Sequence, residues 1–196
     1  MTDDLPPIDP RRAALLVMDY QPGIIGRLPD PEPLLARVNE AIATARQAGA
    51  AVGYVRVAFA DEDYQAVPAT NPMFANAAAN RAMRHESPET AVDERVDPHP
   101  GDIVVRKTRV GAFSTTDLHE QLRQRGIDTL VLAGIATSGV VLSTVRDAAD
   151  RDYRILVLED ASADPDPEVH ALLTGKVFPR QGHVIATAQL ADLLSD

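Results

Sequence analysis

The sequence predicts an α/β fold, in which helices cover both faces of a doubly wound, mostly parallel six-stranded sheet in three layers. Six apolar runs of strand length are nearly continuous rather than alternating, which is typical of parallel strands buried on both faces. Helical patterns separate these runs, and alternation of strand and helix with short connections gives right-handed βαβ units. The expected strands are 13–18, 51–57, 102–105, 129–133, 154–158 and 183–186.

The expected helices lie between or after these strands. The helix at 34–48 carries one apolar stripe and ends at Gly49, and the helix at 115–125 ends at Gly126 in the same way. The remaining expected helices are 138–151, 167–176 and 187–194. Ligands bind such sheets at the carboxyl ends of the strands, so the functional residues are sought there.

Composition limits the classes of function that remain. A chain of 196 residues that is 45% hydrophobic can bury a core as one domain, so residues 1–196 are expected to form a single domain with an N-terminal tail at 1–11. A formal charge of −10 opposes binding to nucleic acid or to an anionic membrane. The first residues lack the pattern of a signal peptide and no apolar run is long enough to span a bilayer, so a cytoplasmic protein is expected.

One connection is much longer than the others. Residues 59–101 contain five prolines and one expected helix, at 73–84. Connections of this length commonly serve as lids, binding loops or contacts between subunits. We therefore expect a lid or an interface segment at 59–101.

Residues that could take part in catalysis or binding follow three of the expected strands. Asp19 follows the first strand and is either a structural acceptor or a site residue, while Lys107 follows the third strand and is by itself most simply a solvated charge. The loop from Gly134 to Gly139 leads directly into a helix. It forms either an anion site built from backbone N–H groups or an ordinary turn capped by Ser138 or the preceding threonine.

Together these segments resemble the isochorismatase-like, or cysteine hydrolase, superfamily over residues 12–194. The resemblance rests on LLVMDYQ at 15–21, KTRVGAFSTTDL at 107–118 and LVLAGIAT at 130–137, which continues into TVRDA at 144–148. It implies the α/β fold described above. It also implies a homodimer or homotetramer that acts on a small molecule.

The resemblance assigns roles to particular positions. It implies Asp19 and Lys107 as catalytic residues, Val140 at the position of the nucleophilic cysteine, and a cis peptide bond between Ile135 and Ala136. The oxyanion loop would consist of Ile135, Ala136 and Val140. The chain has no cysteine, and an isopropyl group cannot attack a carbonyl, so covalent thiol catalysis is excluded.

Further candidates come from the same motifs. The candidate substrate-binding residues are Gln21, Arg109, Phe113 and Thr137, and a core role for Phe113 is an equal alternative. The region after the second strand lacks the aspartate and two histidines of the metal-dependent branch of the superfamily, so we expect no metal and no cofactor.

Three functions remain compatible with the sequence. The first, which the resemblance to isochorismatases implies, is hydrolysis of a vinyl ether, in which Asp19 would protonate the enol carbon and water would attack the resulting oxocarbenium ion. The second is an inactive homologue that binds a small ligand bearing a carboxylate. The third is an amidase in which Asp19 would activate water. Lys107 would lower the pKa of the aspartate and burial would raise it, and the sequence does not decide between them.

Overall fold

The sheet has its strands in the order β3-β2-β1-β4-β5-β6, and every neighbouring pair is parallel. The structure is a computed structural model that describes residues 5–194, so residues 1–4 of the expected N-terminal tail lie outside it. The strands of the described chain are β1 (Ala13–Met18), β2 (Ala51–Val57), β3 (Ile103–Lys107), β4 (Thr129–Ile135), β5 (Arg154–Ala163) and β6 (His183–Ile185). The predicted doubly wound α/β fold is confirmed.

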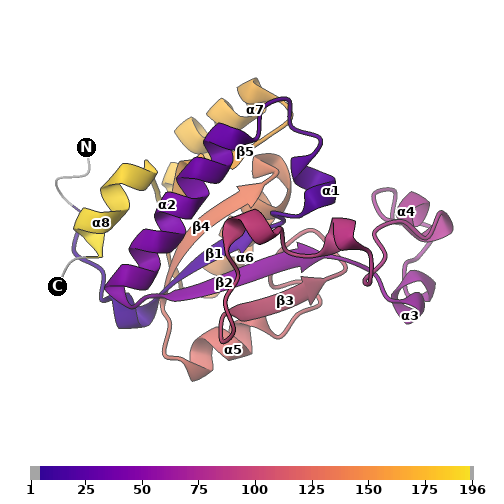
Figure 1. Cartoon of the computed structure of the whole chain (residues 1–196), viewed down its shortest axis with the longest axis horizontal. Helices are drawn as coiled ribbons and strands as arrows, with labels where there is room; N and C mark the ends of the chain where they lie inside the picture. The colour runs from indigo at the N-terminus through magenta and orange to yellow at the C-terminus, as the bar shows by residue number, and fades with distance from the viewer. Residues whose placement is uncertain (1–4, 195–196) are drawn as a thin grey trace.

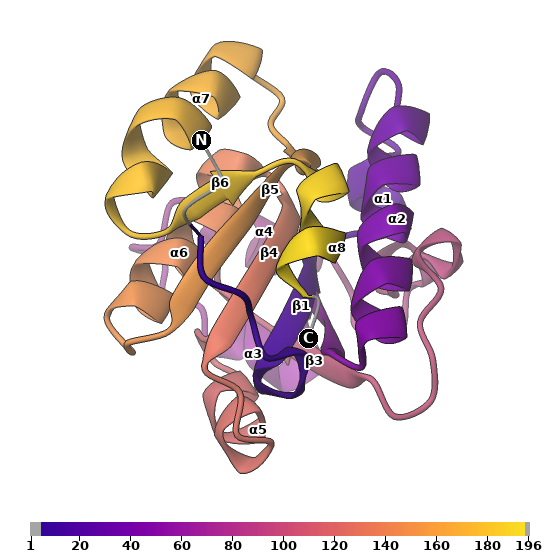
Figure 2. The same cartoon turned by 90° about the vertical axis from the view of Figure 1, so that its left-hand side faces the viewer.

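Helices cover both faces of this sheet (Figures 1 and 2). The side chains of β1 alternate between two hydrophobic clusters: Leu15 and Val17 pack with α2 and α8, and Leu16 and Met18 pack with α5 and α6. A strand buried on both faces can therefore be apolar at every position, as β1 is. The α-helices are α1 (Pro22–Ile25), α2 (Glu32–Ala48), α3 (Asp61–Gln65), α4 (Ala75–Ala79), α5 (Leu118–Gln124), α6 (Leu142–Ala149), α7 (Pro167–Leu172) and α8 (Leu190–Leu193).

The helix ends follow the expected glycine signals. Gly49 and Gly126, with φ of 81° and 69°, follow α2 and the last turn of α5, where a left-handed residue costs glycine little. Three expected helices are not α-helical throughout. Shorter turns take up the difference: the π-helical turns Thr137–Val141 and Leu173–Val177 and the 3₁₀ turn Thr187–Gln189. The other 3₁₀ turns are Pro10–Arg12, Pro88–Thr90, Glu94–Val96 and Phe178–Arg180.

Three strands extend beyond their predicted ends, and one of them, β4, runs two residues further, to Ile135. β3 runs to Lys107, so this lysine is the last residue of the strand rather than a residue beyond it. β5 continues through Glu159 and Asp160, whose charges hid the second half of the strand in the sequence. The pairing of β5 with β4 shifts register between Leu132 and Gly134, which accommodates this extension.

The part of segment 59–101 that carries α3 and α4 projects beyond the carboxyl ends of the strands (Figure 1), and the rest returns to the sheet, where Val96 is buried in the core. The predicted helix at 73–84 is wrong in extent, because α4 ends at Ala79. Arg81 and Met83 have φ of 48° and 55°, which a helix does not allow, and Arg84 then pairs in an isolated bridge with Phe59. Helix propensity in this alanine-rich stretch is thus overridden by pairing with the chain just beyond β2.

Candidate active site

Two opposite charges meet where β1 and β3 end. The Lys107 Nζ lies 2.8 Å from Asp19 Oδ2, although β2 lies between the two strands. Both side chains are buried, with relative exposures of 2% for Lys107 and 5% for Asp19. The backbone at Asp19 is left-handed, with a φ of 60°, and its N–H donates to Val55 O at 2.8 Å. The turn that ends β1 therefore directs the carboxylate toward the lysine.

All the donors of Lys107 have protein acceptors. Besides Asp19, the ammonium donates to Arg109 O at 3.2 Å and to Val110 O at 2.7 Å. A protonated lysine has three N–H donors, and these three oxygens match that number. Lys107 thus holds the Asp19 carboxylate in a fixed position relative to the chain that follows β3.

The carboxylate of Asp19 is only partly satisfied. Its Oδ2 accepts from Lys107, while Oδ1 is buried and has no hydrogen-bond partner within the described chain. Burial raises the pKa of Asp19 to about 6, and the attraction and hydrogen bond of Lys107 oppose this rise. Burial therefore outweighs the ammonium, and near neutral pH the carboxyl group can both release and take up a proton.

The loop after β4 lies beside this pair. The Ile135–Ala136 peptide bond is cis, as the resemblance implies, and the π-helical turn Thr137–Val141 follows it. The Ser138 N–H donates to Asp164 Oδ2 at 2.7 Å, so an aspartate from the end of β5 already occupies this amide. Thr137 Oγ1 lies 2.8 Å from His170 Nδ1 on α7. The loop is thus held by two groups that the sequence analysis did not single out.

Val140 is buried in the π-helical turn, with a relative exposure of 2%. It packs over the ends of the central strands: a Cβ built on Gly134 would lie 3.2 Å from Val140 Cγ1 and 3.3 Å from Met18 Cβ. The absence of a side chain at Gly134 allows this close approach of the turn to the sheet. Val140 therefore fills space next to the residue that precedes Asp19.

The four candidate substrate-binding residues use their polar or aromatic groups within the protein. The Gln21 amide donates to Val57 O at 3.0 Å and Thr90 O at 2.8 Å and accepts from Val57 N. Arg109 donates to Thr108 O at 2.6 Å. Thr137 bonds to His170, as described above. The Phe113 ring stacks on Tyr153 at a centroid distance of 5.9 Å, within the core.

Two hollows flank α1 at this edge of the sheet. One, of about 420 Å³, includes Gln21 and Val57 in its lining, and the other, of about 440 Å³, includes Ile135 and Ala136. Ile24 and Arg27 line both of them. Gln21 connects the first hollow to Asp19, because its N–H donates to Asp19 O at 2.9 Å.

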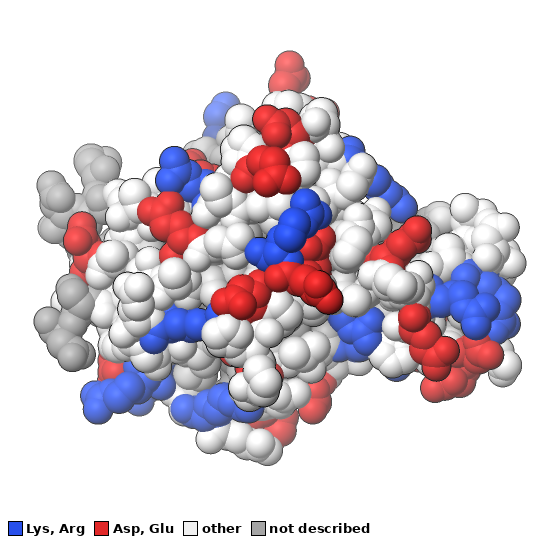
Figure 3. Space-filling model, viewed as in Figure 1, with Lys and Arg blue, Asp and Glu red and all other residues white. Residues whose placement is uncertain are grey.

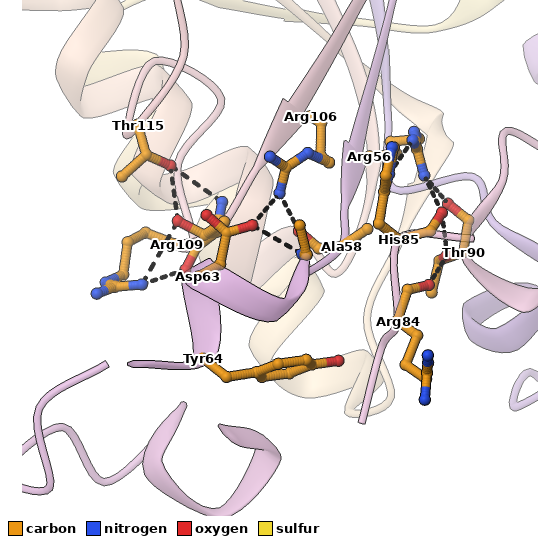
Figure 4. A network of polar contacts seen from close by, with 12 residues as sticks. Arg56, Ala58, Asp63, Tyr64, Arg84, His85, Thr90, Arg106, Arg109 and Thr115 are labelled. Carbon is orange, nitrogen blue, oxygen red and sulfur yellow. Dashed lines mark hydrogen bonds and ion pairs between the residues drawn. The ribbon is translucent and has the colours of Figure 1, made fainter. Parts of the chain in front are cut away.

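A polar network anchors the long segment to the ends of β2 and β3 (Figure 4). Arg106 donates to Ala58 O at 3.0 Å and pairs with Asp63 on α3, and Arg56 donates to Thr90 O at 3.0 Å. The burial of Arg56 lowers the pKa of its guanidinium, and Arg106 contributes to the same shift. No three histidine, aspartate or glutamate side chains of the described chain converge closely enough to hold a metal ion.

The family model for the isochorismatase domain matches residues 13–189. The chain belongs to the isochorismatase family. The ureidoacrylate amidohydrolase RutB of Enterobacter sp. (strain 638) is 34% identical over 182 residues, which cover 81% of this chain and 78% of the relative.

Solved structures of this family share the fold. An isochorismatase family protein of Burkholderia thailandensis is 29% identical, with a TM-score of 0.82 over 97% of this chain and 99% of that one. The N-carbamoylsarcosine amidase of Thermoplasma acidophilum is 30% identical, with a TM-score of 0.73 over 90% and 96% of the two chains. Within the described residues, the structure contains no helix whose length and apolar character would suit a membrane span.

Proposed function

We propose that this protein is a thiol-free hydrolase of the isochorismatase family, with Asp19 as the general acid in the cleavage of a vinyl ether. The observation that carries the proposal is the free Oδ1 of Asp19, a buried carboxylate oxygen without a partner, on a group whose pKa is raised to about 6. A carboxyl group that is partly protonated near neutral pH can donate a proton to carbon and recover it from water.

The reaction needs no nucleophilic side chain. Asp19 transfers its proton to the enol carbon, and the electron pair of the double bond forms the new C–H bond and leaves an oxocarbenium ion. Water adds to that ion and gives up a proton to the carboxylate, and the hemiketal collapses to pyruvate and an alcohol. In this reaction Lys107 is a positioning residue rather than a ligand for the substrate, because its three donors are engaged with protein oxygens.

In this proposal Val140 takes the position where cysteine hydrolases have their nucleophile. A buried isopropyl group excludes water from that side of the site and offers no lone pair. The protein would then retain the acid and the lysine of the family while it uses water as the only nucleophile.

Substitution of Asp19 by asparagine tests the proposal. Because asparagine has no proton to give, we expect release of pyruvate from isochorismate to fall by about 10²- to 10⁴-fold. Pyruvate would be measured by a coupled lactate dehydrogenase assay, with Asp150→Asn on the exposed end of α6 as the matched control. Absence of turnover of any enol-pyruvyl ether by the parent protein would overturn the proposal.

The pH dependence gives a second expectation for the same group. Asp19 must be protonated to act as the acid, so kcat should be highest below pH about 6 and fall tenfold per unit well above it. The profile would be measured with isochorismate from pH 4.5 to 8.5. A rate that rises with pH through this range would show instead that Asp19 acts as a base.

A second candidate function is hydrolysis of a ureido or carbamoyl compound by activated water. It is favoured by the identity of 34% with a ureidoacrylate amidohydrolase and of 30% with an N-carbamoylsarcosine amidase. Val140→Cys distinguishes the candidates: if only the thiol has been lost, the variant should release ammonia from N-carbamoylsarcosine or ureidoacrylate. Ammonia release by the parent protein would favour this second candidate over the first. If neither the parent protein nor Val140→Cys hydrolyses any of these substrates, the result would favour an inactive homologue that binds a ligand.

A further inference from the structure

The hollow of about 420 Å³ adjoins the candidate active site but has a different character. Its floor is formed by Gln21, Val57 and Thr90, which the Gln21 amide ties together. Its walls come from α1 and the residue Arg27 that follows it, and from residues 81–89 of the long segment. The volume is in the range of small-molecule sites, and Gln21 is bonded directly to the backbone of Asp19.

Three arginines line this hollow, and they differ in whether their guanidinium groups have partners within the described residues. Arg81 pairs with Asp61, and its guanidinium lies 5.2 Å from the centre of the Tyr64 ring. The guanidinium groups of Arg27 and Arg84, in contrast, make no hydrogen bond or ion pair within residues 5–194. Figure 4 shows the Arg84 side chain directed away from the network around Arg56.

The neighbouring arginines differ from Arg27 and Arg84, because their guanidinium groups bind protein oxygens. Arg56, Arg106 and Arg109 all donate to backbone carbonyl oxygens, and Arg106 also has a carboxylate partner. The chain has 29 acidic residues against 19 lysines and arginines, and Figure 3 shows acidic and basic side chains close together over much of one face. Two unpaired guanidinium groups in one hollow therefore leave donors available for a ligand.

The rest of the lining indicates the shape of that ligand. Ile24, Val57 and Met83 are apolar residues of the lining, and Glu89 is its acidic residue. Guanidinium groups bind carboxylates through paired, charge-assisted hydrogen bonds, whereas a second negative charge near Glu89 would be repelled. A ligand that places one carboxylate in this hollow, attached to a ring or chain with apolar surface, meets both conditions.

We infer that Arg27 and Arg84 form a subsite for one carboxylate of a small acid, in the hollow that Gln21 connects to the backbone of Asp19. For the substrate, the inference rests on the proposed function and adds that the reacting molecule carries a carboxylate away from the bond that is cleaved. The binding of the anion itself does not depend on any turnover.

Benzoate and benzamide are suitable probes because they have the same shape and differ in charge. Isothermal titration calorimetry would compare their Kd values for the parent protein and for Arg27→Gln, Arg84→Gln and Glu89→Gln. The matched control is Arg180→Gln, an exposed position ahead of β6 at the opposite edge of the sheet. Thermal unfolding would confirm that each variant is folded.

We expect benzoate to bind at least tenfold more tightly than benzamide to the parent protein. Each of Arg27→Gln and Arg84→Gln should weaken benzoate about tenfold and leave benzamide unchanged, while Glu89→Gln should tighten benzoate. Equal affinity for the two probes, failure of benzoate to bind at millimolar concentration, or an equal loss in Arg180→Gln would overturn the inference.

The same measurements on Asp19→Asn separate the two proposals. This variant should bind benzoate although it has lost turnover, so failure of the proposed reaction leaves the subsite intact. If isochorismate is hydrolysed, Arg84→Gln should raise KM about tenfold with little change in kcat, because the arginine binds the ground state and the transition state equally. A fall in kcat at unchanged KM would contradict the assignment.

Discussion

The ends of β1, β3 and β4 and the long segment 59–101 are neighbours in space but are built in different ways. At the strand ends, Asp19, Lys107 and Val140 are buried on a frame of parallel strands, and their partners are few and close. The long segment has short helices and left-handed residues, and polar side chains tie it to the sheet. In the two proposals made above, proton transfer lies at the buried strand ends, whereas recognition of the carboxylate uses Arg27 after α1 and Arg84 of the long segment.

The largest expected difference between the two regions is in stability. Leu16 is fully buried in β1, so Leu16→Ala should lower the free energy of unfolding by about 2–5 kcal/mol. Met73 lies in the long segment and is 64% exposed, so Met73→Ala should change the free energy of unfolding by no more than about 0.5 kcal/mol. Urea unfolding monitored by circular dichroism measures both. Similar losses in the two variants would mean that the exposed surface around Met73 stabilises the fold as much as the interior of β1 does.

The next effect concerns Lys107, which links the two regions through its contacts to the chain after β3. Lys107→Met removes the attraction that opposes the burial of Asp19, so the pKa of the aspartate should rise above about 6, by about 1–3 units. The pH at which kcat falls should move upward by the same amount. Lys176→Met, at the other lysine of the chain and exposed, is the control. An unmoved pH profile would show that Lys107 does not act through Asp19.

The smallest expected effect is at the anchor of the segment. Asp63→Asn weakens the ion pair between Asp63, whose side chain is 22% exposed, and Arg106, whose side chain is 30% exposed. Because ion pairs near the surface contribute little, the free energy of unfolding should fall by less than about 1 kcal/mol. Arg106 keeps its bond to Ala58 O. If the segment forms the wall of the ligand site, Asp63→Asn should raise KM for isochorismate while it lowers the melting temperature only slightly. A melting temperature lowered by 10 °C or more would contradict this.

Much of the frame could be predicted because burial on both faces leaves a strong pattern. The bounds of β1 and β2 match their apolar runs at every residue, and the glycines after α2 and α5 mark real helix ends. The long segment lacks such a pattern. The helix predicted at 73–84 was wrong because local propensity could not report that Arg84 pairs with Phe59.

The candidate site was predictable only in part. The positions of Asp19 and Lys107 at strand ends pointed to one edge of the sheet, but not to the contacts made there. Arg27 was missed because it lies in an ordinary loop after α1, and no motif marks a guanidinium that happens to lack a partner. Asp164 and His170, which hold the loop after β4, come from distant parts of the chain and carry no local signal.

The sequence by itself determined which strands and helices follow one another along the chain, because hydrophobic periodicity is a local property. It also determined that no thiol is present, because that depends only on residue identity. Only the tertiary structure decided the state of the acid. Burial raises the pKa of Asp19 more than Lys107 lowers it, and this balance depends on how completely the surrounding chain removes water from the carboxylate. Folding likewise commits the lysine to two carbonyl oxygens and leaves Arg27 and Arg84 without a side-chain partner among residues 5–194, because it brings distant segments to one end of the sheet.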